Sequence, residues 1–355
     1  MWNHHVLMER LNVQYPIIQA GMAGGITTPH LVSTVSNAGC LGTLGAGYMN
    51  PVDMKDDIRQ IKQLTPHAYG VNLFIPEFPS VTKSELKNAE LLLDPYRKNL
   101  QLEDEPAIKD RENVFDKQIE LILQERVPVC SFTFGVPSKD VIKDLKDAGI
   151  VVIGTATTVE EAIINEEKGV DLIVAQGSEA GGHRGTFLGP YENAMIGTMS
   201  LVPQVVDHIN IPVIAAGGIM DGRGVVAAFA LGAQGVQMGT AFVTSTESGA
   251  DAQYKEAILQ ATENETVITS AFSGKPARGI QNRFIHEMKE YGDQILPYPL
   301  QNTLTKDIRK AAAIHKSPEY MSLWSGQSPR LSVGESATKI LESIILQAEK
   351  VKSGN

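Results

Sequence analysis

Short apolar runs recur along the chain, and most are followed by glycine or polar residues and then by a helical pattern. Most of these runs are continuously apolar and do not alternate with polar residues, as expected for parallel strands that are covered on both faces. The pattern predicts eight strands, at residues 15–21, 39–47, 68–76, 127–135, 150–156, 170–177, 211–218 and 233–240.

Segments with helical spacing separate these runs. Several of them end in glycine, which is typical of a helix C-terminus, and the segment 157–169 starts with threonine ahead of a carboxylate-rich first turn. Eight strands alternating with helices predict an α/β fold, a (β/α)8 TIM barrel, with an open doubly wound sheet as the alternative. The predicted helices are 29–39, 137–149, 157–169, 200–210 and 221–233.

Two regions are additional to a minimal barrel. Residues 77–112 follow the third strand, are polar and contain prolines, so we expect an insertion of helical excursions that covers or borders the active-site face. Residues 265–355 are too long for one closing helix. We expect them to form a small, mostly helical lobe beside the barrel mouth, with a final amphipathic helix at about 335–350 packing on the barrel. The predicted division is therefore a barrel domain over 1–264 and a C-terminal segment over 265–355.

Composition and charge narrow the function classes. With 43% hydrophobic and 20% charged residues, the chain can bury a large core. A net charge of -10, without a basic cluster, disfavours nucleic acids and anionic membrane surfaces as partners. No long apolar run predicts a membrane span or a signal peptide, so a cytoplasmic location is expected. The two cysteines, Cys40 and Cys130, lie in apolar contexts without metal-ligand spacing, so we predict buried thiols and no metal site.

In a barrel of this kind the active site lies at the carboxyl ends of the strands. The segment "AAGGIMDGRG" (215–224) follows the seventh predicted strand, and "QMGTAF" (237–242) follows the eighth. The glycines would let backbone N–H groups approach phosphate oxygens, and Thr240 would add a hydroxyl. Together these two loops predict a phosphate site, although the glycines could instead only turn the chain.

The side chains that follow other strands are uncharged. Met22, Asn72 and Gln176 suit a flat neutral heterocycle that carries amide and carbonyl groups, or they could simply cap strand-end backbone groups. No GxGxxG follows a strand, and there is no Walker A lysine. A ring and a phosphate without a dinucleotide fingerprint predict FMN as the cofactor.

The sixth predicted strand leads into a bare loop, "GSEAGGHRG" (177–185), which contains His183. Glycines would leave space above a bound ring, and an imidazole there could act as a base, a proton donor or a partner for an anion. A histidine that only stabilises the loop is the alternative. We expect Glu179 to orient His183 or to hold the loop, and Arg184 to be solvated or ion-paired.

Five segments occur together in one order: "YPIIQAGMAGG", "GVNLF", "AQGSEAGGHRG", "IPVIAAGGIMDGRG" and "GVQMGTAF". With these motifs, and with "WSGQSP" (324–329) near the C-terminus, the chain resembles the nitronate monooxygenase family over essentially its whole length. The resemblance implies an FMN-dependent TIM barrel with a smaller second lobe. It also implies oxidation of alkyl nitronates, such as propionate 3-nitronate, by dioxygen to a carbonyl compound and nitrite, without NAD(P)H.

The resemblance also implies roles for individual residues. His183 matches the family's active-site histidine, which is described as the catalytic base toward neutral nitroalkanes. Gly21 and Met22 should lie against the flavin ring. The other residues that should contact FMN are Asn72, Gln176, Gly181, Gly218, Gln237, Met238, Gly239 and Thr240.

Two other functions are consistent with the same residues. The superfamily also contains FMN-dependent enoyl-acyl-carrier-protein reductases and NAD(P)H:quinone reductases, which share the barrel and an "EAGGH"-like loop. The continuation "HRG" favours the monooxygenase. The third function is an FMN-binding protein without turnover. The expected partners are a small anionic substrate and dioxygen, detoxification of nitronates is the expected role, and a homodimer is compatible with the sequence.

Overall fold

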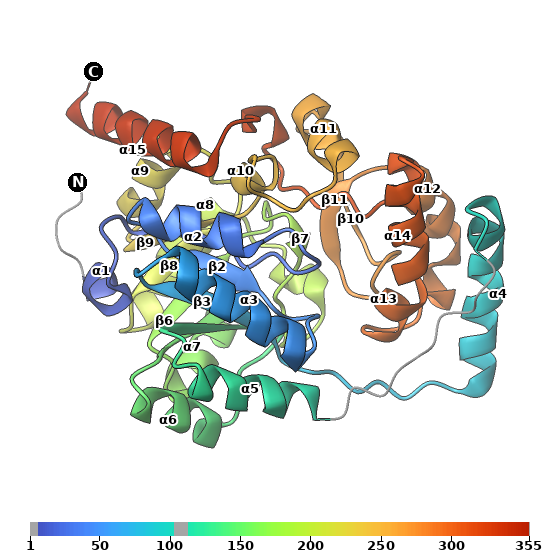
Figure 1. Ribbon diagram of the computed structural model, residues 1–355, viewed down its shortest axis with the longest axis horizontal. Coiled ribbons are helices and arrows are strands. Elements are labelled where there is room, and N and C mark those ends of the chain that lie inside the picture. The colour runs from blue at the N-terminus through green and yellow to red at the C-terminus, as the bar shows by residue number, and fades with distance from the viewer. Residues whose placement is uncertain (1–5, 103–112, 355) are drawn as a thin grey trace.

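The computed structural model describes residues 6–102 and 113–354, and its main element is a ring of eight parallel strands with helices around it (Figure 1). The strands lie in the order β1-β9-β8-β6-β5-β4-β3-β2. Each lies within one of the predicted apolar runs, so the predicted TIM barrel is confirmed. The strands are β1 (Ile17–Gln19), β2 (Gly42–Gly45), β3 (Tyr69–Phe74), β4 (Val129–Thr133), β5 (Val151–Ala156), β6 (Leu172–Gln176), β8 (Val213–Ala216) and β9 (Gly235–Met238).

A short bridge closes the ring between β1 and β2, where Ile18 pairs with Leu41 in parallel orientation. The amide of Gln19 donates to the carbonyl oxygen of Leu41 over 2.9 Å, and the amide of Leu41 donates to that of Ile17 over 3.0 Å. Closure leaves neither β1 nor β2 as a free edge. The alternative of an open doubly wound sheet is therefore wrong.

Successive strand residues point to opposite sides of the ring. Ile17 belongs to the core between strands and outer helices, whereas its neighbour Ile18 belongs to the core inside the ring. Helix α1 (Val6–Leu11) adds Leu7 and Leu11 to that inner core. Both cores are built from the continuous apolar runs, because a strand buried on both faces needs apolar residues at every position.

The five helices that the sequence pattern predicts all form, as α2, α6, α7, α8 and α9, whereas α3, α5 and α10 were not predicted. In α7, for example, the Thr158 side chain accepts a hydrogen bond from the amide of Glu161, and Gly169 ends the helix at φ 98°. These local signals explain why helix positions were predictable. The helices around the barrel are α2 (Pro29–Asn37), α3 (Pro51–Leu64), α5 (Val114–Gln124), α6 (Lys139–Asp147), α7 (Val159–Lys168), α8 (Thr198–His208), α9 (Gly222–Ala230) and the short α10 (Thr240–Val243).

The last helix, α15 (Ala337–Ser353), packs on the barrel against α9 and α2. The approach to α9 is close, because a Cβ at Gly222 would lie 2.2 Å from the amide nitrogen of Ala348. The amide of Gly222 donates to Oε1 of Gln347 over 2.8 Å. Figure 1 shows α1 and α15, the first and last helices, on the side of the molecule away from α4.

A second, smaller body stands beside the barrel (Figure 1). Its sheet joins β10 (Thr266–Thr269), β11 (Ala277–Ile280) and the two-residue β7 (Gly182–His183) in antiparallel pairing. The sequence pattern predicted a mostly helical lobe and did not locate these strands, since strands this short show no clear period. The helices of this region are α11 (Ala252–Gln260), α12 (Arg283–Met288), α13 (Leu300–Leu304) and α14 (Lys306–Ile314).

Helix α4 (Lys83–Asn99), from the predicted insertion, packs on this second body. The buried guanidinium of Arg97 donates to the carboxylate of Asp307 over 3.0 Å and to the carbonyl oxygen of Leu304 over 2.7 Å. The ring centroids of Tyr96 and Phe284 lie 4.9 Å apart. The helical part of the insertion thus extends the second body.

The predicted domain boundary between residues 264 and 265 stays a prediction. The apolar cluster of the second body also includes residues that precede this boundary, among them Tyr254 of α11 and Leu93 of α4. Residues 103–112 of the predicted insertion lie outside the described residues. Over 6–102 and 113–354, no helix is both long and apolar enough to span a bilayer.

Candidate active site

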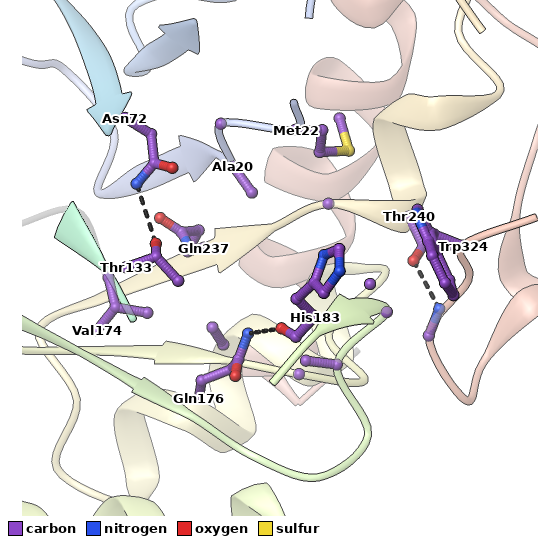
Figure 2. A pocket seen from close by; sticks show the side chains of 18 of the residues that line it. Ala20, Met22, Asn72, Thr133, Val174, Gln176, His183, Gln237, Thr240 and Trp324 are labelled. Atoms are coloured by element: carbon purple, nitrogen blue, oxygen red, sulfur yellow. Dashed lines mark hydrogen bonds between the residues drawn. The ribbon is translucent and has the colours of Figure 1, made fainter. Parts of the chain in front are cut away.

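A cavity opens at the carboxyl ends of the barrel strands, where this fold class places its active sites. Its volume is about 1260 Å³ when the space at the open mouth is included. Figure 2 shows lining side chains from β3, β4, β6 and β9 around this space. Trp324, Gly326 and Ser328 of the C-terminal segment line it as well.

Ten of the eleven residues predicted for the site line this cavity. The exception is Met238, whose side chain is 1% exposed and packs in the core outside the ring. Neighbouring strand residues alternate in direction, so Gln237 reaches the cavity and Met238 does not. Met238 could therefore make the predicted contact with the flavin only through its backbone. The ten residues are Gly21, Met22, Asn72, Gln176, Gly181, His183, Gly218, Gln237, Gly239 and Thr240.

Glycine-rich backbone forms the end of the cavity near β8 and β9. Gly217 and Gly218 have φ values of 113° and 70°, which glycine adopts without strain. The hydroxyl oxygen of Thr240 accepts a hydrogen bond from the amide of Gly326 over 2.9 Å, and its own proton is available to a ligand (Figure 2). A Cβ at Gly181 would lie 2.4 Å from the nitrogen of Gly326. A side chain at position 181 would therefore prevent the close approach of these two loops.

Uncharged amides line the cavity farther inside the barrel. The Asn72 side-chain nitrogen donates to the hydroxyls of Ser131 and Thr133, over 3.0 Å and 3.2 Å. The amide of Gln237 is partly exposed and makes no side-chain hydrogen bond within the described residues, which leaves its donor and acceptor available to a ligand. These neutral groups suit the edge of a ring that carries carbonyls and N–H groups.

Gln176 makes two side-chain hydrogen bonds to the protein, and its predicted contact with the flavin stays a prediction. Its side-chain nitrogen donates to the carbonyl oxygen of His183 over 3.1 Å, and its oxygen accepts from the amide of Gly185 over 2.8 Å. Both ends of the amide thus hold the loop that carries His183 (Figure 2). The residue lines the cavity, and both of these hydrogen bonds are to the protein.

His183 lies in β7 at the cavity wall, where Ala277 of β11 pairs with it. Aromatic rings surround the imidazole, with centroids at 5.7 Å for Phe134, 6.2 Å for Tyr298 and 5.5 Å for Trp324. Its Nε2 lies 2.8 Å from the hydroxyl oxygen of Ser273. The glycine-rich loop therefore places the imidazole in contact with other side chains of the protein, at the wall of the cavity.

Burial, and then the positive charges of Lys275 and Arg309, lower the pKa of His183 to about 3. The imidazole is therefore uncharged at neutral pH. The Lys275 side chain is 15% exposed, and its ammonium lies 2.5 Å from the carboxylate of Glu77. Glu77 is the first residue of the predicted insertion, so the start of the insertion reaches this region. Both positive charges act on His183 and favour an anionic ligand there, while the Glu77 carboxylate offsets part of the charge of Lys275.

Two other residues of the loop hold its backbone in place. The carboxylate of Glu179 accepts hydrogen bonds from the amide and the hydroxyl of Thr198, at the start of α8. It does not orient His183. Arg184 was expected to be solvated or ion-paired, but its side chain is 1% exposed and donates to the carbonyl oxygens of Gln176, Gly177 and Ala194. The expectation of a solvated Arg184 is wrong, because backbone carbonyls of the loop need a donor that solvent does not provide there.

Several residues around His183 were not predicted. Ser273 and Lys275 lie in "SGKP" (273–276), whose Gly and Pro between two short runs indicate a hairpin turn. That signal locates a turn without showing that it lies beside His183. The described residues contain no group of three or more His, Cys, Asp or Glu side chains that could hold a metal ion. The lining residues that were missed include Tyr48, Phe134, Tyr254, Trp324, Gly326 and Ser328.

Comparison with known proteins adds a second line of evidence. The family model described as nitronate monooxygenase matches residues 5–347. A protein of Staphylococcus aureus strain MSSA476, described as "Probable nitronate monooxygenase", is 55% identical over 353 residues, which cover 99% of each chain. A protein of strain MRSA252 with the same description shows the same identity and coverage.

Two solved structures are similar over nearly the whole chain. The nitroalkane oxidase from Streptomyces ansochromogenes superposes with a TM-score of 0.91 at 37% identity, covering 98% of this chain and 99% of its own. FabK from Thermotoga maritima superposes with a TM-score of 0.77 at 32% identity, covering 98% of this chain and 97% of its own.

Proposed function

The chain belongs to the nitronate monooxygenase family, and from this premise we propose that it oxidises alkyl nitronates, such as propionate 3-nitronate, with dioxygen to a carbonyl compound and nitrite. Family membership makes it a flavin-dependent oxidoreductase. The observation that carries the proposal for the substrate is the uncharged imidazole of His183, with the cations Lys275 and Arg309 beside it, at a cavity lined by neutral amides.

We propose FMN as the flavin. The neutral amides of Asn72 and Gln237 suit the edge of its ring, and the glycine backbone at 217–218 with the Thr240 hydroxyl suits its phosphate. Gly21 and Met22 line the same cavity and would lie against the ring. When bound, FMN supplies the two-electron acceptor that oxidation of the substrate requires.

The proposed work of the protein's own side chains is positioning and proton transfer. A nitronate is already an anion, so the positive potential of Lys275 and Arg309 supports its binding beside His183. A neutral nitroalkane would first lose its α-proton, and His183 is the proposed catalytic residue that accepts it. The electron pair of the broken C–H bond stays on the substrate, which becomes the nitronate.

The second candidate is an FMN-dependent NAD(P)H reductase acting on an enoyl thioester of acyl-carrier protein or on a quinone. The similarity to FabK from Thermotoga maritima, at 32% identity over 98% of the chain, favours it. The nitroalkane oxidase matches with the higher TM-score, 0.91 against 0.77, and this difference supports the first candidate.

Anaerobic flavin bleaching tests the proposal. Purified protein should be yellow, and propionate 3-nitronate should bleach it without oxygen, whereas NADH and NADPH should leave it oxidised. Admitting air should then release nitrite. Bleaching by NADH or NADPH alone would establish the reductase instead. A flavin that no donor bleaches would indicate a flavin-binding protein without turnover.

A cytoplasmic location and a homodimer also stay proposals. Light scattering on the eluate of a sizing column would measure the molar mass of the assembly directly. A mass of about one chain would contradict the homodimer.

A further inference from the structure

The hydroxyl of Ser273 makes three contacts, all with named atoms. Its oxygen lies 2.8 Å from Nε2 of His183. It donates to the carbonyl oxygen of Lys275 over 3.0 Å, and it accepts from the amide of Lys275 over 3.3 Å. Ser273 itself is 1% exposed and is not among the residues that line the cavity, so its hydroxyl is shielded from solvent.

A hydroxyl has one proton to donate and two lone pairs with which to accept. The proton of Ser273 is used on the Lys275 carbonyl, and one lone pair is used on the Lys275 amide. The contact with His183 must therefore use the second lone pair, so Nε2 of His183 is the donor. The opposite arrangement would take this partly buried hydrogen bond away from the carbonyl of Lys275, which costs free energy.

We propose that Ser273 is a positioning residue that holds neutral His183 as the tautomer with its proton on Nε2, leaving Nδ1 as the basic atom. Within the described residues Nδ1 has no hydrogen-bond partner of its own. The low pKa of His183 agrees with a neutral ring, whose two nitrogens then have different roles. The inference deepens the proposed function, because it names the atom of His183 that takes the α-proton of a neutral nitroalkane.

The hydrogen bonds run from His183 to Ser273 and end at the carbonyl oxygen of Lys275. A backbone carbonyl accepts a hydrogen bond but does not take up the proton. Ser273 is therefore an anchor and does not relay protons to solvent. A proton taken up at Nδ1 stays on the imidazolium until Nδ1 returns it to the cavity. Nε2 keeps its hydrogen bond to Ser273 throughout, so the ring does not need to turn.

The loop that carries Ser273 is itself held in place. The carbonyl oxygen of Ser270 accepts from the amides of Ser273, over 3.2 Å, and Gly274, over 2.8 Å. Gly274 has a φ of 78°, and a Cβ there would lie 2.1 Å from the carbonyl oxygen of Leu296. The pairing of Ala277 with His183 ties the end of the loop to β7. The Ser273 hydroxyl is thus positioned by backbone on both sides.

Nitrogen-15 NMR of histidine-labelled holoenzyme tests the tautomer without any turnover. The signals of His183 are those that disappear in His183→Asn. At neutral pH we expect a proton on Nε2 and none on Nδ1 in the wild type. In Ser273→Ala we expect a mixture of both tautomers, and in Ser273→Thr, which keeps the hydroxyl, a return to the wild-type pattern. A proton on Nδ1 in the wild type, or an unchanged pattern in Ser273→Ala, would overturn the proposal.

Kinetics with a neutral nitroalkane and with its nitronate distinguish a positioning role of Ser273 from a general structural role. Ser273→Ala should lower kcat/KM for a neutral nitroalkane by about tenfold or more, because only this form needs a base. For the nitronate of the same carbon skeleton the change should stay below about twofold. Equal losses on both forms would assign Ser273 a purely structural role.

Ser270→Ala is the matched control. Ser270 lies in the same loop, and its hydroxyl makes no hydrogen bond within the described residues, so both spectra and rates should match the wild type. Flavin content and thermal melting would show that each variant is folded. If neither nitroalkane nor nitronate is turned over by the wild type, the proposed function fails. The NMR result still decides the tautomer in that case.

Discussion

His183 shows how strongly the surroundings of one side chain change its chemistry. Burial and the charges of Lys275 and Arg309 lower its pKa from the ordinary 6.5 to about 3. The ring is therefore uncharged at physiological pH and has a free lone pair for a proton. An anionic ligand beside it would raise this pKa, because opposite charge favours the protonated ring.

Replacement of this histidine tests its proposed catalytic role. His183→Asn keeps a neutral polar side chain but has no basic nitrogen, so kcat/KM for a neutral nitroalkane should fall by about 100-fold or more. Flavin content should stay at the wild-type level. Nitrite release and flavin absorbance measure the two quantities. Loss of flavin with normal turnover per bound flavin would instead assign His183 to cofactor binding.

The lowered pKa of His183 also predicts how stability depends on pH. As pH falls below about 6.5 the unfolded chain binds a proton at this residue, whereas the folded protein does not bind it until about pH 3. The unfolded state gains the proton first, so the free energy of unfolding contributed by this group falls from pH 6.5 toward pH 3.

Because His183→Asn lacks this titration, its unfolding free energy should fall less than that of the wild type over the same range. Denaturant unfolding at a series of pH values measures the difference. Two curves that run parallel from pH 7 to the acid limit of folding would contradict the lowered pKa.

At the scale of single elements, the turn between β8 and α9 depends on backbone that only glycine adopts easily. In Gly218→Val the new side chain would need a φ of 70°, and its Cβ would lie 3.2 Å from the Cβ of Glu179. We expect the bound flavin per protein to fall several-fold, as measured by absorbance. Gly334→Ala, where the nearest atom is 3.5 Å away, is the control. Unchanged flavin content in Gly218→Val would remove this turn from the binding site.

An ion pair between the buried Arg97 and the partly exposed Asp307 helps to hold helix α4 on the second body. Arg97→Met should lower the free energy of unfolding by about 2 kcal/mol or more, since Asp307 and the carbonyl of Leu304 lose their donor. Thermal and denaturant unfolding measure the loss. Lys143→Met, which removes a pair on the surface, should cost much less. Equal costs for the two variants would contradict the buried role of Arg97.

At the scale of the whole molecule, the C-terminal helix α15 covers the barrel only because α9 begins with a glycine. Gly222→Val would place a side chain within 2.2 Å of the Ala348 nitrogen and push α15 outward. We expect a loss of about 1–3 kcal/mol in the free energy of unfolding. Gly292→Ala, with nothing within 4 Å, should cost much less. A wild-type melting temperature for Gly222→Val would show that α15 is not packed as described.

Local signals made much of this architecture predictable. A strand buried on both faces must be apolar at every position, and a helix end needs a cap or a glycine, so strands and helices could be located from short stretches of chain. The same is true of the glycine-rich turns, because few other residues adopt their φ values. Ten of the eleven predicted site residues line one cavity for this reason, since each lies in the carboxyl-terminal half of a barrel strand or in the segment that follows the strand. Met238 does not, because strand alternation turns its side chain into the core.

The sequence by itself therefore determined the barrel, the order of its elements and the loops at its mouth. Only the tertiary structure decided what surrounds His183: Ser273, 90 positions away, and the cations Lys275 and Arg309. It also decided that Arg184 is buried among carbonyl oxygens. The physical reason is that hydrophobic period and turn chemistry act over a few residues, whereas a pKa and a tautomer depend on whichever distant side chains the fold brings into contact.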